Sequence, residues 1–119
     1  MFTINGNGKE IAELFKKFGL GEYESRVYFA LQIAGKTKVG KLWVSAGVPQ
    51  NKVYNTVQTL STKGLIETTN IRPLEVRAKP FLRFANDYLT DRKCSLYEIQ
   101  EKIEDYREVI KNKPMKIQF

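Results

Sequence analysis

Histidine is absent from this 119-residue chain, and Cys94 is its only cysteine. The absence of histidine excludes His-based catalytic triads and the ordinary Cys/His zinc sites. A single thiol can neither form a disulfide within the chain nor complete a structural metal site. The sequence also shows no nucleophile–base pair and no cluster of carboxylates. We therefore expect a protein that is not an enzyme and that holds no metal or other cofactor.

Long apolar runs are missing too. The chain contains no run of membrane-spanning length, and its N-terminus lacks the pattern of a signal peptide. Both absences predict a cytoplasmic protein without a membrane partner.

Acidic residues are scarce in the middle of the chain. Residues 1–35 carry four Lys/Arg and four Asp/Glu, residues 36–79 carry eight and two, and residues 80–119 carry eight and seven. Almost all of the net charge of +7 therefore comes from the middle segment. A basic surface favours a polyanionic partner, although total charge alone does not separate nucleic acid from an acidic protein or a membrane surface.

The segment from Pro49 to Lys63 contains no acid and is predicted to form one helix. Gly47-Val48 interrupts the preceding segment, Pro49 suits a first helical position, and Gly64 suits a C-terminal cap. One face is an apolar stripe made by Val53, Thr56, Val57 and Leu60. The other face carries amides, hydroxyls and one cation: Gln50, Asn51, Lys52, Tyr54, Asn55, Gln58 and Thr59. These groups can hydrogen-bond base edges and phosphates, which predicts a DNA-recognition helix. The alternative is an ordinary polar surface helix.

The elements around this segment complete a winged helix-turn-helix domain over residues 1–79. Apolar periodicity predicts helices over residues 9–18, 22–34 and 38–46, the last with Thr37 as its N-cap and Trp43 in the core. Alternating β-branched residues predict a two-stranded wing over residues 65–69 and 74–78. The fold class is thus mainly α, with a small β component (α+β).

Four further cations are candidates for phosphate contacts. Lys38 and Lys41 lie near the start of the third predicted helix, where a helix-turn-helix meets the phosphate backbone. Arg72 lies at the predicted wing tip and Arg77 on its second strand, within reach of a minor groove or phosphate. For both lysines an ordinary solvated surface position is the alternative.

A long helix, beginning after Pro80 and running to about Lys111, is predicted to form the C-terminal region, residues 80–119. Nine of its residues are spaced alternately three and four apart, as in a coiled coil: Leu82, Ala85, Leu89, Arg92, Leu96, Ile99, Ile103, Tyr106 and Ile110. We name this set the seam. Its outer part needs a partner, and the simplest partner is a second copy of the chain, joined through Leu89, Leu96, Ile99, Ile103, Tyr106 and Ile110. Folding back of the helix through a break near Asp91–Ser95 is the alternative.

The stretch from about Phe18 to Leu89 resembles the N-terminal DNA-binding domain of the TrmB-like transcriptional regulators, winged-helix proteins found largely in archaea. Three blocks carry the resemblance: FGLGEYESRVYFAL, AGVPQNKVYNTVQTLSTKGLIE and IRPLEVRAKP. The resemblance implies binding to double-stranded DNA, usually as a dimer on an inverted repeat. It also implies that Gln50, Asn51, Lys52 and Tyr54 start the recognition helix and that Arg72-Pro73 lies in the wing.

Two departures from the family pattern matter. Gly21 stands where the family often has a threonine that caps the following helix, which implies a small loss of local stability. Larger members continue into a sugar-sensing domain, for which these 119 residues leave no room. The resemblance therefore does not extend to a sugar response, and we expect no small-molecule effector.

Three functions remain open at this point. The first is a sequence-specific transcription regulator that binds double-stranded DNA as a homodimer on a near-palindromic site. The second is an architectural or non-specific DNA-binding protein, which needs the same basic surface but no base reading. The third is a winged-helix protein-interaction module, whose polar helix meets a protein.

Overall fold

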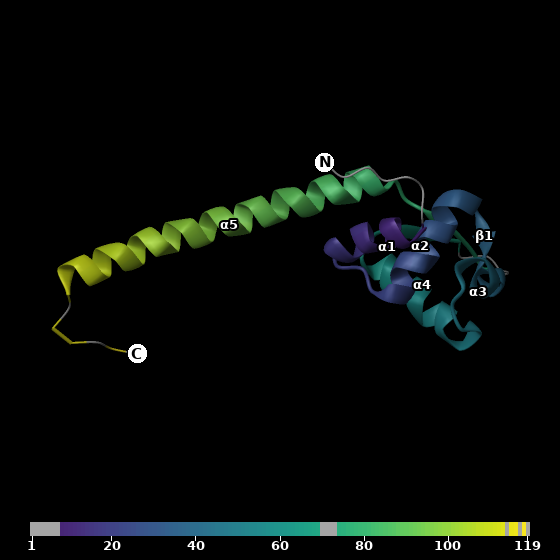
Figure 1. Cartoon of the computed structure of the whole chain (residues 1–119), viewed down its shortest axis with the longest axis horizontal. Coiled ribbons are helices and arrows are strands. Elements are labelled where there is room, and N and C mark those ends of the chain that lie inside the picture. Colours follow the sequence, from purple (N-terminus) through teal and green to yellow (C-terminus); the bar gives the residue numbers. More distant parts are fainter. Residues whose placement is uncertain (1–7, 70–73, 114, 117, 119) are drawn as a thin grey trace. The chain divides into compact units, whose positions relative to one another are not determined.

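The computed structural model describes residues 8–69, 74–113, 115, 116 and 118. The chain forms two compact units, which divide between Phe84 and Ala85. The first unit holds the helices and strands of the predicted winged domain (Figure 1). The second unit consists mainly of the continuation of one long helix.

Buried apolar faces of short helices build the core of the first unit. Its helices are α1 (Gly8–Lys17), α2 (Glu22–Ala34), α3 (Leu42–Ala46) and α4 (Val53–Thr62), with 3-10 turns η1 (Val39–Lys41) before α3 and η2 (Gln50–Lys52) before α4. Helix α2 is central, because its Val27, Tyr28 and Leu31 are completely buried. The other helices and the sheet pack around this face with residues such as Phe15, Leu42, Leu60 and Val76.

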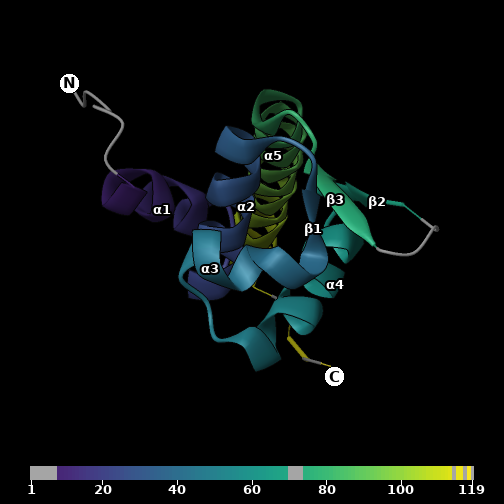
Figure 2. The same ribbon diagram turned by 90° about the vertical axis from the view of Figure 1, so that its right-hand side faces the viewer.

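A three-stranded antiparallel sheet lies beside the helices. Its strands are β1 (Thr37–Lys38), β2 (Ile66–Thr68) and β3 (Glu75–Ala78), in the order β1-β3-β2 (Figure 2). The β2–β3 hairpin is the predicted wing, and β1 adds a third strand to what the sequence indicated as a two-stranded ribbon. Thr37 lies opposite Val76 in the β1–β3 ladder.

The buried Tyr28 ties the sheet to α2. Its hydroxyl donates a hydrogen bond to the carbonyl oxygen of Lys79 at 2.6 Å, directly after β3. Burial raises the pKa of this phenol, because the charged form is poorly solvated there. The backbone N–H of Lys79 donates to the carbonyl oxygen of Leu65 at 2.8 Å, so α2, β2 and the end of β3 are held together at one point.

The predicted third helix over residues 38–46 is wrong in its first half. Thr37 is no N-cap, since it lies in β1 and its hydroxyl donates to the carbonyl oxygen of Gly35 at 3.1 Å. The α-helical part is only Leu42–Ala46, and this short helix buries its first and last residues. Trp43, placed in the core from the sequence, follows Leu42 by about 100° around the helix axis. It is 40% exposed, so that placement is wrong as well.

The segment predicted as one helix from Pro49 begins differently. Pro49 stands before η2 in an extended conformation, and the regular α-helix starts only at Val53. Its end is as expected, because Gly64 has a φ of 79°, a left-handed conformation that glycine adopts without strain. The start of the polar face therefore lies on a tighter turn than the rest.

Helix α5 (Phe81–Asn112) is continuous, as its sequence predicts (Figure 1). Its first turn belongs to the first unit, where the ring of Phe81 lies 5.0 Å from that of Phe15 and 5.2 Å from that of Phe18. The interruption near Asp91–Ser95, which folding back requires, does not occur.

Candidate nucleic-acid interface

The predicted reading face of η2 and α4 lies open to solvent. Its amides and its aromatic residue are all exposed, namely Gln50, Asn51, Tyr54, Asn55 and Gln58. The opposite face is buried at Val53, Thr56, Val57 and Leu60, the spacing that the sequence indicated. We name the exposed set, together with Lys52, the reading face.

Threonine hydroxyls of α4 are engaged by the helix itself. Thr56 donates to the carbonyl oxygen of Lys52 at 2.8 Å, and Thr59 donates to that of Thr56 at 2.9 Å. Thr62 does the same with the carbonyl oxygen of Gln58 at 3.0 Å. The amide side chains of the reading face have no such partner within the described residues, so they keep both donors and acceptors for a ligand.

The predicted phosphate contacts differ in how far their charge is compensated. Lys41 and Lys52 are exposed and form no ion pair among the described residues. Lys38 is exposed on β1, but it lies opposite Glu75 in the β1–β3 ladder. Lys41 and Lys52 therefore offer the most available positive charge near the reading face.

The wing holds one predicted cation in an ion pair. Arg77 lies opposite Glu67 in the β2–β3 ladder, and its Nη2 lies 2.6 Å from Glu67 Oε2. The hydrogen bond from Arg77 lowers the pKa of the Glu67 carboxyl, and the charge of Arg77 adds to this effect. Arg77 can meet a phosphate only in competition with this acid. Arg72 lies outside the described residues.

The stretch without acids is longer than the predicted recognition helix. Glu24 and Glu67 are consecutive acids, so no acid occurs anywhere from Ser25 to Ile66. This segment also contains Lys36, an exposed cation that the sequence interpretation left out. The absence of acids from Ser25 to Ile66 would have indicated Lys36, although Lys36 lines a small hollow together with Glu67 and Glu75.

The seam of α5 is exposed within this single chain. Its residues predicted to pair two chains are 44% to 65% exposed: Leu89, Leu96, Ile99, Ile103, Tyr106 and Ile110. The apolar residues at this spacing are therefore left exposed along one side of the helix.

Other sites find little support in the described residues. No group of three or more His, Cys, Asp or Glu side chains there is placed to hold a metal ion. In the same part of the chain, each helix falls short of the length or the apolar character that crossing a membrane requires.

Comparisons with known proteins identify the family and agree with the fold. Over 65 residues the chain is 31% identical to the HTH-type sugar sensing transcriptional regulator TrmBL1 of Pyrococcus furiosus, a match that covers 55% of this chain and 19% of TrmBL1. Among solved structures it is similar to TrmBL2, described as an archaeal chromatin protein with a novel mode of DNA binding. That similarity has a TM-score of 0.76 at 23% identity and covers 87% of this chain and 40% of TrmBL2.

A shorter protein has the same fold. A possible transcriptional regulator from Methanosarcina mazei Go1 matches with a TM-score of 0.62 at 9% identity, over 89% of this chain and 96% of that protein. At such identities these structures show the fold alone, which is that of winged-helix regulators. The family described as sugar-specific transcriptional regulator TrmB matches residues 14–81, more than half of the sequence. The chain therefore belongs to the TrmB family.

Proposed function

We propose that this chain is a transcription regulator that binds double-stranded DNA as a homodimer at a near-palindromic site. The observation that carries the proposal is the reading face. It is exposed and free of acids, and its amides have no partner within the described residues. A helix with these properties can enter a major groove without repelling the phosphates on either side.

The side chains divide into two roles. Gln50, Asn51 and Asn55 read base edges, because a side-chain amide pairs well with an adenine, and Tyr54 and Gln58 extend this contact. Lys41 and Lys52 hold phosphates on either side of the turn before η2. Lys38, Arg72 and Arg77 add to this hold from β1 and the wing.

Dimerisation follows from the seam. Pairing two copies of α5 covers the exposed apolar stripe and supplies two reading faces for one duplex. Half-sites read by such a dimer are centred about one DNA turn apart, roughly 34 Å. Two-fold symmetry of the protein then demands a near-palindromic site.

A second function is favoured by one observation. TrmBL2, with the same fold over most of this chain, is described as a chromatin protein. A DNA-coating role uses the same cations and leaves the amides of the reading face without a base to read. Both functions depend steeply on salt, so salt dependence does not distinguish them. The ratio of specific to non-specific affinity does.

Selection of bound sequences from a random duplex pool tests the proposal. We expect a near-palindrome, bound at least a hundredfold more tightly than random duplex. Replacing Asn51 by Ala should remove about 1–3 kcal/mol of this preference, whereas Lys52→Ala should weaken all duplexes alike and reduce the salt slope by about 1. Equal binding of selected and random duplexes would support the DNA-coating role. Unchanged affinity in both variants would favour protein recognition.

A further inference from the structure

Two side chains of α2 reach the two ends of the segment that carries the reading face. At its front, Arg26 Nη1 donates a hydrogen bond to the carbonyl oxygen of Gly47 at 3.0 Å. Gly47 forms the turn between α3 and η2, with a left-handed φ of 65°. Arg26 therefore fixes the backbone just before the reading face begins.

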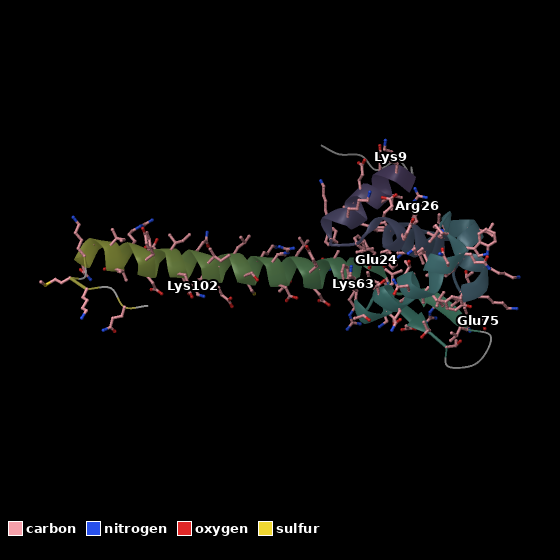
Figure 3. The ribbon with its side chains drawn as sticks, turned by 90° about the horizontal axis from the view of Figure 1, so that it is seen from below. Lys9, Glu24, Arg26, Lys63, Glu75 and Lys102 are labelled. Atoms are coloured by element: carbon pink, nitrogen blue, oxygen red, sulfur yellow. The ribbon has the colours of Figure 1, made fainter. Side chains whose placement is uncertain are left out.

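The rear end is held by a separate contact. Lys63 is the C-terminal cap of α4, and its Nζ donates to the carbonyl oxygen of Gly19 at 2.9 Å. The same ammonium lies 3.0 Å from Glu24 Oε1 and 2.9 Å from Glu24 Oε2 (Figure 3). Glu24 is itself held by the backbone N–H of Gly21 at 3.0 Å.

The front contact also leads back to the rest of the domain. Arg26 Nε lies 3.1 Å from Glu22 Oε1, and Lys16 Nζ of α1 lies 2.5 Å from Glu22 Oε2. Lys16 in the first place, and Arg26 in the second, lower the pKa of the Glu22 carboxyl. A chain of polar contacts thus runs from α1 through α2 to the turn before η2.

The cations between Ser25 and Ile66 differ in whether they are paired with an acid. Arg26 and Lys63 lie near the two ends of this segment and pair with Glu22 and Glu24, which lie outside it. Lys41 and Lys52 lie between them and form no ion pair among the described residues. Arg26 and Lys63 therefore bind backbone carbonyl oxygens within the protein, whereas Lys41 and Lys52 are available to a ligand.

We infer that Arg26 and Lys63 are positioning residues for base readout, an inference that rests on the proposed function. They set the ends of the reading segment without touching DNA. Base contacts are short and directional, so a small shift of α4 weakens them strongly. Phosphate contacts from long lysine side chains tolerate the same shift. Loss of either positioning residue lowers discrimination between sequences and leaves non-specific affinity almost unchanged.

Acid substitutions give the sharpest test, because loss of positioning lowers the ratio of specific to non-specific affinity, whereas a purely electrostatic effect leaves this ratio unchanged. Glu24→Gln keeps an acceptor for the backbone N–H of Gly21 and weakens the contact with Lys63. Glu22→Gln weakens the contact with Arg26 in the same way. Removing a negative charge should raise the affinity for specific and random duplexes alike through electrostatics, which by itself does not change their ratio. We expect the ratio of specific to non-specific affinity to fall nonetheless, by about two- to thirtyfold.

Cation variants complete the design. Arg26→Gln and Lys63→Met should lower the same ratio and leave the salt slope of random-duplex binding unchanged, with Lys63→Arg restoring the ratio. Lys52→Ala is the matched control, which lowers the slope by about 1. A slope that falls equally for Lys63→Met identifies a phosphate contact and overturns the inference. So does an unchanged ratio in the acid variants.

Hydrogen exchange of the free protein separates this inference from the proposed function. We expect faster exchange of α4 amides in Glu24→Gln and Lys63→Met, and no change in Lys52→Ala, with circular dichroism confirming that all variants fold. If the wild-type chain prefers no sequence, the proposed function fails, and the exchange data still decide whether the contact between Glu24 and Lys63 holds α4. Equal exchange in all variants overturns the positioning role.

Discussion

The acid-free segment and helix α5 use charge in different ways. From Ser25 to Ile66 the chain excludes acids altogether, so every charged side chain there is a cation. Helix α5 carries both signs in nearly equal number and sorts them by face. With Leu82 at position a of the heptad, the acids all occupy the outer positions b, c and f: Asp87, Asp91, Glu98, Glu101, Glu104, Asp105 and Glu108.

The inner face of α5 holds only cations among its charged residues. Arg92 lies in the seam itself, and Lys93, Lys102 and Arg107 occupy the flanking e and g positions. By net charge alone, the acid-free segment is basic and helix α5 is nearly neutral. The arrangement shows instead that both regions present cations at the surface where a partner is expected. A polyanion suits the first surface, whereas a second copy of α5 brings its own cations to the second.

Breaking the seam should have the largest effect. Ile103→Asp places a carboxylate in the apolar stripe, and a charge buried without a partner costs several kcal/mol. We expect the dimer to weaken by a factor on the order of a hundred or more, measured by sedimentation equilibrium. Palindrome affinity should fall with it, while affinity for a single half-site stays.

Glu101→Ala is the matched control for this substitution. It changes the outer face of the same helical turn and should leave the dimer intact. A dimer that survives Ile103→Asp would show that another surface joins the two chains. A dimer lost equally in Glu101→Ala would show that the seam has no special role.

Removing a cation beside the seam should have a smaller effect of opposite sign. Lys102→Gln relieves repulsion between like charges, so we expect dimerisation to tighten by a few-fold at low salt, as for exposed charge pairs of about 0.2–1 kcal/mol. The wild-type dimer should tighten as salt is added, whereas DNA binding weakens. Sedimentation at two salt concentrations measures both trends for wild type and variant.

Lys102→Glu then distinguishes the two orientations of the pair. In a parallel pair position g faces position e of the next heptad on the other helix, so a glutamate at 102 meets Arg107 and should tighten the dimer further. In an antiparallel pair position g faces position g, so this gain is absent. A dimer weakened by Lys102→Gln would contradict the repulsion itself.

The helices that carry both surfaces, and their exposed faces, could be predicted from the sequence because each depends on local spacing. The apolar stripe of α4 and the seam of α5 repeat at helical intervals, and long periodic segments fold as their pattern indicates. The continuous α5 and the buried Val53 and Leu60 confirm this. Composition also showed that the segment around α4 contains no acids, an observation that needs no knowledge of the fold.

The errors come from contacts between distant segments. Thr37-Lys38 becomes a strand only because β3, almost forty residues later, pairs with it. The ion pair of Arg77 with Glu67 follows from the register of the hairpin, which the sequence does not state. Trp43 lies outside the core because the rest of the domain packs against the face of α3 that Leu42 and Ala46 share, about 100° around the helix axis from Trp43. In each case long-range packing overrides a local preference.

The pair of Arg77 and Glu67 gives the smallest expected effect. Glu67→Gln releases Arg77 from its acid, so the salt slope of random-duplex binding should become steeper by up to about 0.9 for each chain. Lys41, already free of acids in the described residues, supplies the comparison, because Lys41→Ala should make the slope shallower by a similar amount. An unchanged slope in Glu67→Gln would show that Arg77 does not reach the duplex.

Acid titration checks the same pair independently of DNA. Arg77 lowers the pKa of Glu67 in the folded protein, so the pair stabilises the fold at neutral pH and loses this contribution as pH falls through the lowered pKa. Both side chains are exposed, so the contribution is small. We expect a slightly lower Tm for Glu67→Gln at pH 7 and equal Tm values once the carboxyl of the wild type is protonated. A difference that persists in acid would assign the effect to packing of the wing rather than to charge.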